Sequence, residues 1–416
     1  MLWTAASVYT NTINRKRRRK LPQLLDRWFS RSNELPLSFK FTSGNERHDK
    51  VMKTFTACVT PFAQRFRHLD LDLHYFVCPT PTDLQLSASQ QTQMHSISWS
   101  TLQFLQLESA IIRDDIEVYN DLETPLFPFA PRLQRLRMDK LSFTGGTPLQ
   151  LILPWSQLTH LILVDLLESH LWLQLFTMCP NLQHGLFVVY EEFTPTPPTA
   201  ERATFHHLVD LTFGFSDPID PSILDHFDFP VLKTLRLQTD NIIRFKEADV
   251  GFWTATIRNR LCRQLAPLER LSLGGSWPFF CIFEAAAHVV ELDLYDIGII
   301  PPFLPWLLHS SDGYSLLPKL RVLSMDIGSY SELPADVLAD TITSRRCAEL
   351  GIEKLILYPC RDSESQKYMK RLTGQLQPLI DDGFILEVRD AMPSHWYKRL
   401  DPTATAWHEG IIDIEE

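Results

Sequence analysis

Residues Leu153 to Leu182 read LPWSQLTHLILVDLLESHLWLQLFTMCPNL and contain one complete structural unit. Leu158, Leu161 and Leu163 predict a strand with an L-x-x-L-x-L core. The apolar residues between positions 171 and 178 predict a helix, after which Cys179-Pro180-Asn181-Leu182 opens the next strand. The inward leucines of one such unit cannot bury themselves, so the unit requires neighbours of the same kind.

The same strand core recurs along the chain. Its middle positions are Leu69, Leu105, Leu136, Leu161, Gly185, Leu211, Leu235, Leu271, Leu292, Leu323 and Leu355. Four consecutive steps, from Leu136 to Leu235, are 25, 24, 26 and 24 residues, within the leucine-rich period of about 20–29 residues. Prolines shortly before the cores, as in Ala130-Pro131 and Phe229-Pro230, predict where each returning helix stops. We therefore predict an α/β fold, a leucine-rich-repeat solenoid whose curved parallel sheet carries helices on its convex side.

The chain divides by pattern into three parts. Residues 1–50 form an N-terminal linker or capping segment, residues 51–390 the solenoid, and residues 391–416 a C-terminal cap or tail. In the first part, the basic run 15–20 is either a nuclear-import signal or anionic-surface patch, or the solvated start of a helix. A helix is expected from Leu21 to Phe29, a strand over 36–41, a last helix over 362–380 and a last strand over 384–388.

Composition limits the class of protein. The 416 residues are 44% hydrophobic and 22% charged, which is ordinary globular usage, and the net charge of −10 argues against a general nucleic-acid binder. The seven cysteines include no C-x-x-C pair, so we expect reduced thiols. No apolar run reaches the ~18–20 residues of a membrane span. We therefore expect a soluble protein of the cytoplasm or nucleus that binds neither membranes nor nucleic acid.

Motifs of enzyme chemistry are missing from the sequence. It has no G-x-S-x-G, P-loop, G-x-G-x-x-G or H-E-x-x-H pattern. His206 and His207 are adjacent, and adjacent side chains of an extended segment point to opposite faces, so they are poorly placed to chelate a metal together. We expect no catalytic residue, no cofactor and no metal site.

The expected fold instead offers a face for binding. Residues between the core leucines point outward on the concave side, and there the charges segregate along the chain with an apolar centre among the basic positions. An exposed apolar centre ringed by charge is typical of a protein-binding site. The alternative is that these are solvated strand residues and that helices or loops cover the apolar ones. The candidate partner-binding residues are Arg135, Arg137, His160, Ile162, Leu186, Val188, Tyr190, Arg236, Arg270 and Asp293.

Several stretches resemble a known family. Leu153-Pro154-Trp155-Ser156-Gln157-Leu158, with Cys179-Pro180-Asn181-Leu182, resembles the repeat region of the F-box/leucine-rich-repeat family of mushroom-forming fungi. Leu24-Leu25-Asp26-Arg27-Trp28-Phe29-Ser30-Arg31-Ser32, with Pro36-Leu37-Ser38, looks like the linker that follows the F-box there. Ser344-Arg345-Arg346, Leu355–Leu357 and Gly383-Phe384-Ile385 resemble the closing repeats.

The resemblance implies a function. It suggests a non-catalytic module that recognises substrates for a cullin-type (SCF) ubiquitin ligase, with a ubiquitination target as partner. The family's F-box, which docks the ligase adaptor, would precede the linker, and nothing ahead of the linker in this chain matches one. We expect adaptor binding only if an F-box exists upstream. The alternative is a stand-alone leucine-rich-repeat scaffold or regulatory protein without a ligase role.

Overall fold

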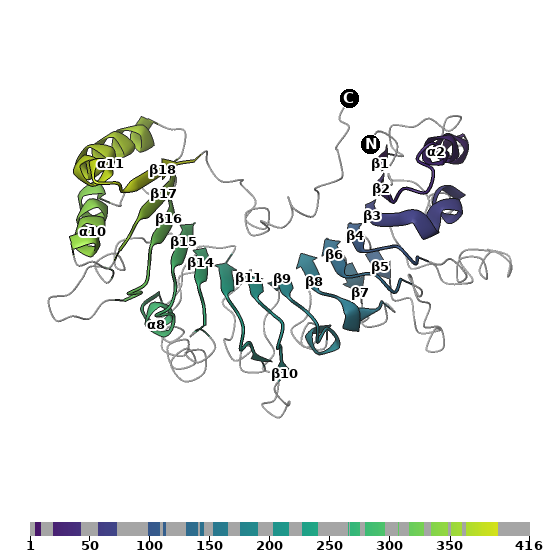
Figure 1. The fold of residues 1–416 in the computed structure, drawn as a ribbon, viewed down its shortest axis with the longest axis horizontal. Helices are drawn as coiled ribbons and strands as arrows, with labels where there is room; N and C mark the ends of the chain where they lie inside the picture. The colour runs from purple at the N-terminus through teal and green to yellow at the C-terminus, as the bar shows by residue number, and fades with distance from the viewer. Residues whose placement is uncertain are drawn as a thin grey trace. The chain divides into compact units, whose positions relative to one another are not determined.

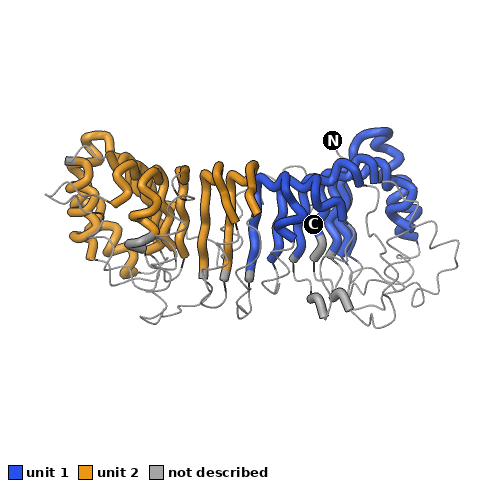
Figure 2. The backbone as a smooth tube through the Cα atoms, turned by 90° about the horizontal axis from the view of Figure 1, so that it is seen from below, with its two compact units in different colours: residues 1–189, 402–416 blue, residues 190–401 orange. Residues whose placement is uncertain are grey.

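The computed structural model describes most of the strands and several of the helices of the chain. It covers residues 5–9, 20–42, 57–72, 99–108, 111–113, 130–139, 142–144, 153–164, 175–189, 203–215, 227–239, 265, 267–274, 279–295, 307, 316–327, 334–347, 351–359 and 363–389. The chain forms two compact units (Figure 2), unit 1 with residues 1–189 and 402–416, and unit 2 with residues 190–401.

The described part of unit 1 is built on one parallel sheet. In sheet order its strands are β1 (Ala5–Tyr9), β2 (Leu37–Thr42), β3 (Phe66–Asp72), β4 (Phe104–Glu108), β6 (Arg135–Asp139), β8 (His160–Val164) and β9 (His184–Val189). Sheet order follows chain order, so each strand pairs with the one before and the one after it. A small parallel pair joins β5 (Ile111–Arg113) to β7 (Ser142–Thr144).

Unit 2 repeats this plan. Its parallel strands, in sheet order, are β11 (Asp210–Phe215), β13 (Thr234–Thr239), β14 (Arg270–Gly274), β15 (Glu291–Tyr295), β16 (Val322–Asp326), β17 (Lys354–Tyr358) and β18 (Ile385–Val388). A short parallel pair joins β10 (Ala203–Thr204) to β12 (Phe227–Asp228). The α/β fold class with a repeated parallel sheet is confirmed.

The predicted leucine register holds from strand to strand. Leu105 pairs with Leu136, and Leu136 with Leu161, so the middle positions of neighbouring cores lie side by side. Gly185 occupies the same position next to Leu161. The ring of Phe187 fills the space that a side chain at position 185 would take, and it packs on Phe176 at 4.3 Å between ring centroids. A large residue two positions later thus replaces the missing leucine.

The residues that the structure describes include several of the segments between the strands. Besides α2 (Leu21–Ser30), the described helices longer than one turn are α8 (Phe279–Ala285), α10 (Ala335–Cys347) and α11 (Ser363–Asp381), with 3-10 segments at Thr60–Arg65 and Trp155–Gln157. In unit 2, α10 and α11 pack against each other (Figure 1). No helix within the described residues is long and apolar enough to cross a membrane.

The prolines before the strand cores lie in tight turns. The carbonyls of Ala130, Cys179, Phe229 and Leu317 each accept a hydrogen bond from the amide three residues later, at 3.1–3.3 Å. In every case a proline follows the accepting residue. The proline is thus at the second position of a β-turn, where its fixed φ is favoured. The residue that opens the turn is buried, so it adds an apolar position to the repeat.

Polar side chains also join successive repeats in unit 1. The residue just before the first core leucine donates to the backbone of the preceding repeat. Thr101 Oγ1 bonds the Phe66 carbonyl at 2.9 Å, Gln157 Nε2 the Leu133 carbonyl at 2.9 Å, and Asn181 Nδ2 the Ser156 carbonyl at 2.8 Å. Satisfying backbone acceptors in this way helps to fix the distance between neighbouring repeats.

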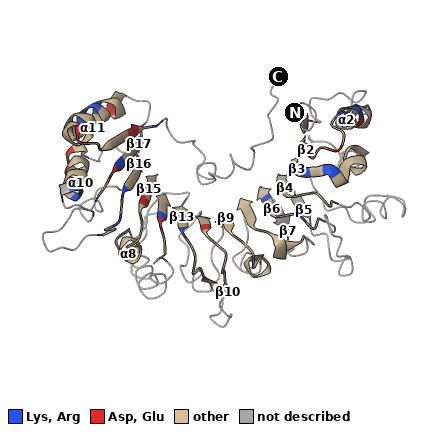
Figure 3. Ribbon diagram, viewed as in Figure 1, with Lys and Arg blue, Asp and Glu red and all other residues tan. Residues whose placement is uncertain are grey.

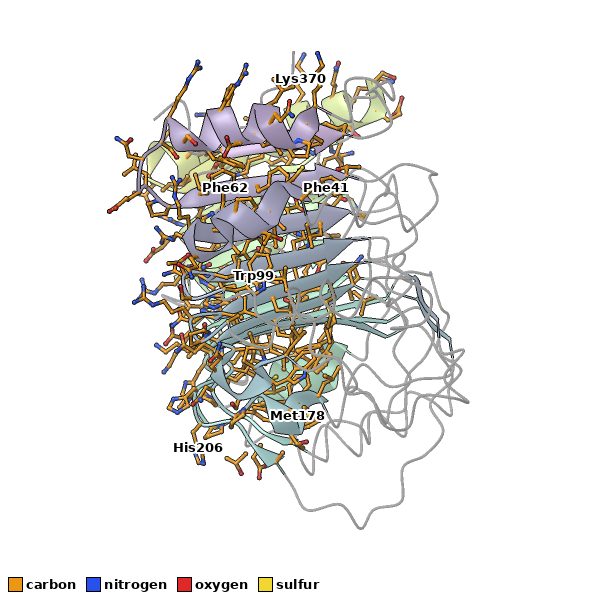
Figure 4. All side chains as sticks on the ribbon, turned by 90° about the vertical axis from the view of Figure 1, so that its right-hand side faces the viewer. Phe41, Phe62, Trp99, Met178, His206 and Lys370 are labelled. Carbon is orange, nitrogen blue, oxygen red and sulfur yellow. The ribbon has the colours of Figure 1, made fainter. Side chains whose placement is uncertain are left out.

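An aromatic cluster closes the N-terminal end of unit 1. Phe29, on the apolar side of α2, is fully buried against the rings of Phe39, Phe62 and Phe66 at centroid distances of 6.0, 5.1 and 5.7 Å. Arg65 donates to the Phe29 and Leu35 carbonyls at 3.2 and 3.1 Å and so holds the end of α2. Figure 4 labels Phe62 and Trp99 along this stack. Helix α2 and strand β2, both predicted, therefore pack on the repeats as part of unit 1.

A buried arginine organises the last repeats of unit 2. Arg345 of α10 is 0% exposed and donates to the carbonyls of Leu307, Leu316 and Leu317 at 3.1, 2.9 and 2.5 Å. Leu317 has a φ of 50°, which is rare for a residue other than glycine. Further on, α11 ends in a Schellman motif, in which the Phe384 amide bonds the Leu379 carbonyl and Gly383 takes a φ of 88°.

Candidate functional site

The face of each sheet opposite the leucine core carries two rows of side chains, and we call it the polar face. The first row precedes the middle core position and the second row follows it. In unit 1 the first row is Ser38, His68, Phe104, Arg135, His160 and His184, and the second is Lys40, Asp70, Gln106, Arg137, Ile162 and Leu186. In unit 2 the first row is Asp210, Thr234, Arg270, Glu291, Val322, Lys354 and Ile385, and the second is Thr212, Arg236, Ser272, Asp293, Ser324, Ile356 and Glu387.

Two predicted residues meet in the first row of unit 1. Arg135 on β6 lies in register with His160 on β8, which lies in register with His184 on β9. The two imidazole rings stack with centroids 4.4 Å apart and planes 20° apart, and His160 Nδ1 lies 2.8 Å from Thr159 Oγ1. Burial, His184 and Arg135 together lower the pKa of His160 from 6.5 to about 3. His160 is therefore neutral near pH 7.

The expected exposed apolar centre is not present. Ile162, Leu186 and Val188 are only 3%, 5% and 2% exposed, so the prediction that they lie open to solvent is wrong. The physical reason lies in their place on the sheet. A mid-strand residue has neighbours ~4.8 Å away on both flanking strands and others along its own strand, and an apolar side chain that does not extend past them is covered by them. Thr212, Ser272 and Ser324, at the same height in unit 2, are equally buried. Tyr190 lies outside the described residues.

The basic positions of unit 2 are already paired. Arg236 forms an ion pair with Asp210, and Arg270 Nε lies 3.0 Å from a Glu291 oxygen. Asp293 accepts a 2.8 Å hydrogen bond from Ser272. Basic and acidic residues accordingly stand on neighbouring strands of this unit (Figure 3). The sequence predicted charges of one sign grouped together at Arg236 and Arg270, whereas local pairing cancels them.

The sequence analysis missed some members of the polar face. His184 occupies the position before its middle core residue, as His160 does, and this equivalence could have identified it. Lys40 and Asp70 pair at 3.2 Å across β2 and β3, with the Asp70 side chain almost fully buried. The strand that carries Lys40 was predicted as part of the N-terminal segment, and its place beside β3 depends on the tertiary structure.

The described residues include two buried thiols and two adjacent exposed histidines. Within the described part of the chain, no group of three or more His, Cys, Asp or Glu could hold a metal ion. Cys58 and Cys179 are free and buried, and burial raises the pKa of each thiol to about 12, so both are protonated at neutral pH. His206 and His207 are both exposed beside β11.

No protein-family model matches the chain, and no curated protein is significantly similar to it. The candidate site therefore rests on the geometry of the polar face.

Proposed function

We propose that this chain is a non-catalytic protein-binding module that uses the polar face of its leucine-rich repeats. The observation that carries the proposal is the register of the parallel strands, which displays side chains from successive repeats in continuous rows. Such rows provide one rigid, extended surface, and repeat proteins commonly bind partners through surfaces of this kind. Rigid display keeps the entropy cost of binding low.

The resemblance described above narrows the proposal. It favours recognition of a ubiquitination target on behalf of a cullin-type ubiquitin ligase, with an F-box supplied upstream of the linker-like segment around Trp28 and Pro36. The fold is compatible with this role because α2 and β2, which carry the linker-like residues, pack directly on the first repeats. An F-box that precedes α2 would thus be connected to the repeats through elements that pack on them.

The test is co-purification of the full chain with binding partners from a lysate that contains cullin-ligase adaptors. Recovery of an adaptor together with a target supports the ligase role. Recovery of a partner without any adaptor, from a chain extended by its upstream coding sequence, would replace that role with a stand-alone scaffold.

A double variant tests the face itself. Arg135→Glu with Arg137→Glu reverses two charges on β6. We expect the partner to be lost while the melting temperature stays close to that of the unchanged chain. Retention of the partner at undiminished affinity would remove this face from the proposal.

A further inference from the structure

Four neighbouring strands of unit 1 carry no carboxylate in the first two rows of the polar face. On β4, β6, β8 and β9 these rows hold Phe104, Arg135, His160, His184, Gln106, Arg137, Ile162 and Leu186. The corresponding rows of unit 2 contain Asp210, Glu291, Asp293 and Glu387. These four strands of unit 1 therefore differ from the strands of unit 2 that carry those acids.

Arg135 is the cation that this difference leaves without a counter-ion. It stands in register between Phe104 and His160, neither of which is acidic, and within the described residues its side chain has no ion-pair partner. Glu108 and Asp139 lie in register with each other further along the strands.

Other cations on the polar faces are neutralised within the fold. Lys40 pairs with Asp70 at 3.2 Å, Arg270 with Glu291 at 3.0 Å, Lys354 with Glu387 at 2.5 Å, and Arg236 with Asp210. Against this pattern, the Arg135 guanidinium has no ion-pair partner among the residues that the structure describes. Guanidinium matches a carboxylate geometrically and forms two parallel hydrogen bonds with it.

The neighbourhood of Arg135 is also electrostatically positive. Burial is the largest cause of the lowered pKa of His160, and the charges of His184 and Arg135 lower it further. An anionic group placed over Arg135 would therefore meet a favourable local field.

We propose that Arg135, flanked by the stacked His160–His184 pair, is the recognition point for an acidic peptide segment of a protein partner. The proposal deepens the binding function proposed above and rests on it. A glutamate or aspartate of the partner would pair with the Arg135 guanidinium. A nucleic acid fits less well, because a chain with a net charge of −10 repels an extended polyanion, whereas a short acidic segment meets only the local field.

The experiment measures binding of a fluorescein-labelled Glu-rich peptide to the full chain by fluorescence anisotropy. A second peptide with Gln at every Glu position separates charge from shape, and inorganic phosphate serves as a competitor. Arg135→Gln removes the charge, and Arg135→Lys keeps it. Arg321→Gln is the matched control, because that guanidinium is paired with Glu353 and lies outside the two rows of the polar face.

We expect the Glu peptide to bind and the Gln peptide not to bind. Arg135→Gln should weaken binding by about tenfold or more, as expected for one hydrogen bond to a charged group, and Arg135→Lys should weaken it less. Arg321→Gln should change affinity less than twofold. Equal losses for Arg135→Gln and Arg321→Gln, or equal binding of both peptides, would overturn the proposal. If inorganic phosphate at millimolar concentration displaces the Glu peptide completely, the site is a phosphate site and the acidic-peptide proposal is wrong.

The two proposals can fail separately. If the Glu peptide does not bind but the natural partner is lost on charge reversal of Arg135 and Arg137, acidic-peptide recognition is wrong and the binding face stands. Melting curves of each variant confirm that a loss of binding does not come from unfolding.

Discussion

Arg345 gives the sharpest test of how unit 2 is held together. Its guanidinium is fully buried and bonds three backbone carbonyls of the segment before β16, at Leu307, Leu316 and Leu317. Arg345→Met keeps an unbranched apolar stem of similar length and removes every donor. The three carbonyls then lose the hydrogen bonds that the buried guanidinium donates to them.

The magnitude follows from these bonds. Depriving a buried carbonyl of its donor costs about 1–3 kcal/mol. Leu317 keeps a second donor, the Leu320 amide at 3.1 Å, so the main losses fall on Leu307 and Leu316. Their sum is about 2–6 kcal/mol. Burial lowers the pKa of Arg345 from 12.5 to about 10, so the charged form is disfavoured there and its removal returns part of that cost. We expect a net loss of about 2–4 kcal/mol.

The assay is thermal unfolding combined with hydrogen exchange. For a body of 150–250 residues, 1 kcal/mol corresponds to about 2–4 °C, so the melting temperature of unit 2 should fall by about 4–16 °C. Faster exchange should be confined to residues 316–327 and 334–347. The matched control is Arg346→Met, whose guanidinium pairs with the exposed Asp382 and should matter by less than 1 kcal/mol. If the two variants have the same melting temperature, the hydrogen bonds from Arg345 to the three carbonyls do not stabilise this region.

Three further predictions concern unit 1. Leu161→Ala should cost about 2–5 kcal/mol as a buried large-to-small change, measured by thermal melting, and a loss near zero would contradict its place in the core. Gly185→Ala should cost about 1–3 kcal/mol, because the added Cβ would lie 2.5 Å from the Phe187 ring; Gly185→Ala with Phe187→Leu should recover part of it. Because folding lowers the pKa of His160 from 6.5 to about 3, the unfolded chain takes up a proton first as pH falls. Stability should thus drop between pH 6.5 and 3, by at most about 1.4 kcal/mol per pH unit, and His160→Phe should flatten that part of the curve.

The spacing of leucines alone was enough to predict the strands of the repeats. A strand alternates its side chains strictly, so L-x-x-L-x-L defines both the inward face and the register, and Leu105, Leu136 and Leu161 pair as that pattern requires. The helix and strand around Phe29 and Phe39 were also readable, since each has a local period of apolar residues. These are short-range properties, and the sequence contains them in full.

Only the tertiary structure decided which outward residues are accessible and which charges are free. Ile162 and Leu186 are outward by pattern yet buried, because exposure depends on what stands on the neighbouring strands. Arg236 and Arg135 look alike in sequence, but Arg236 pairs with Asp210, 26 positions earlier in the chain, while Arg135 lies in register with Phe104 and His160, which are not acidic. Electrostatic pairing depends on distances of a few ångströms between residues far apart in sequence, and folding alone sets those distances.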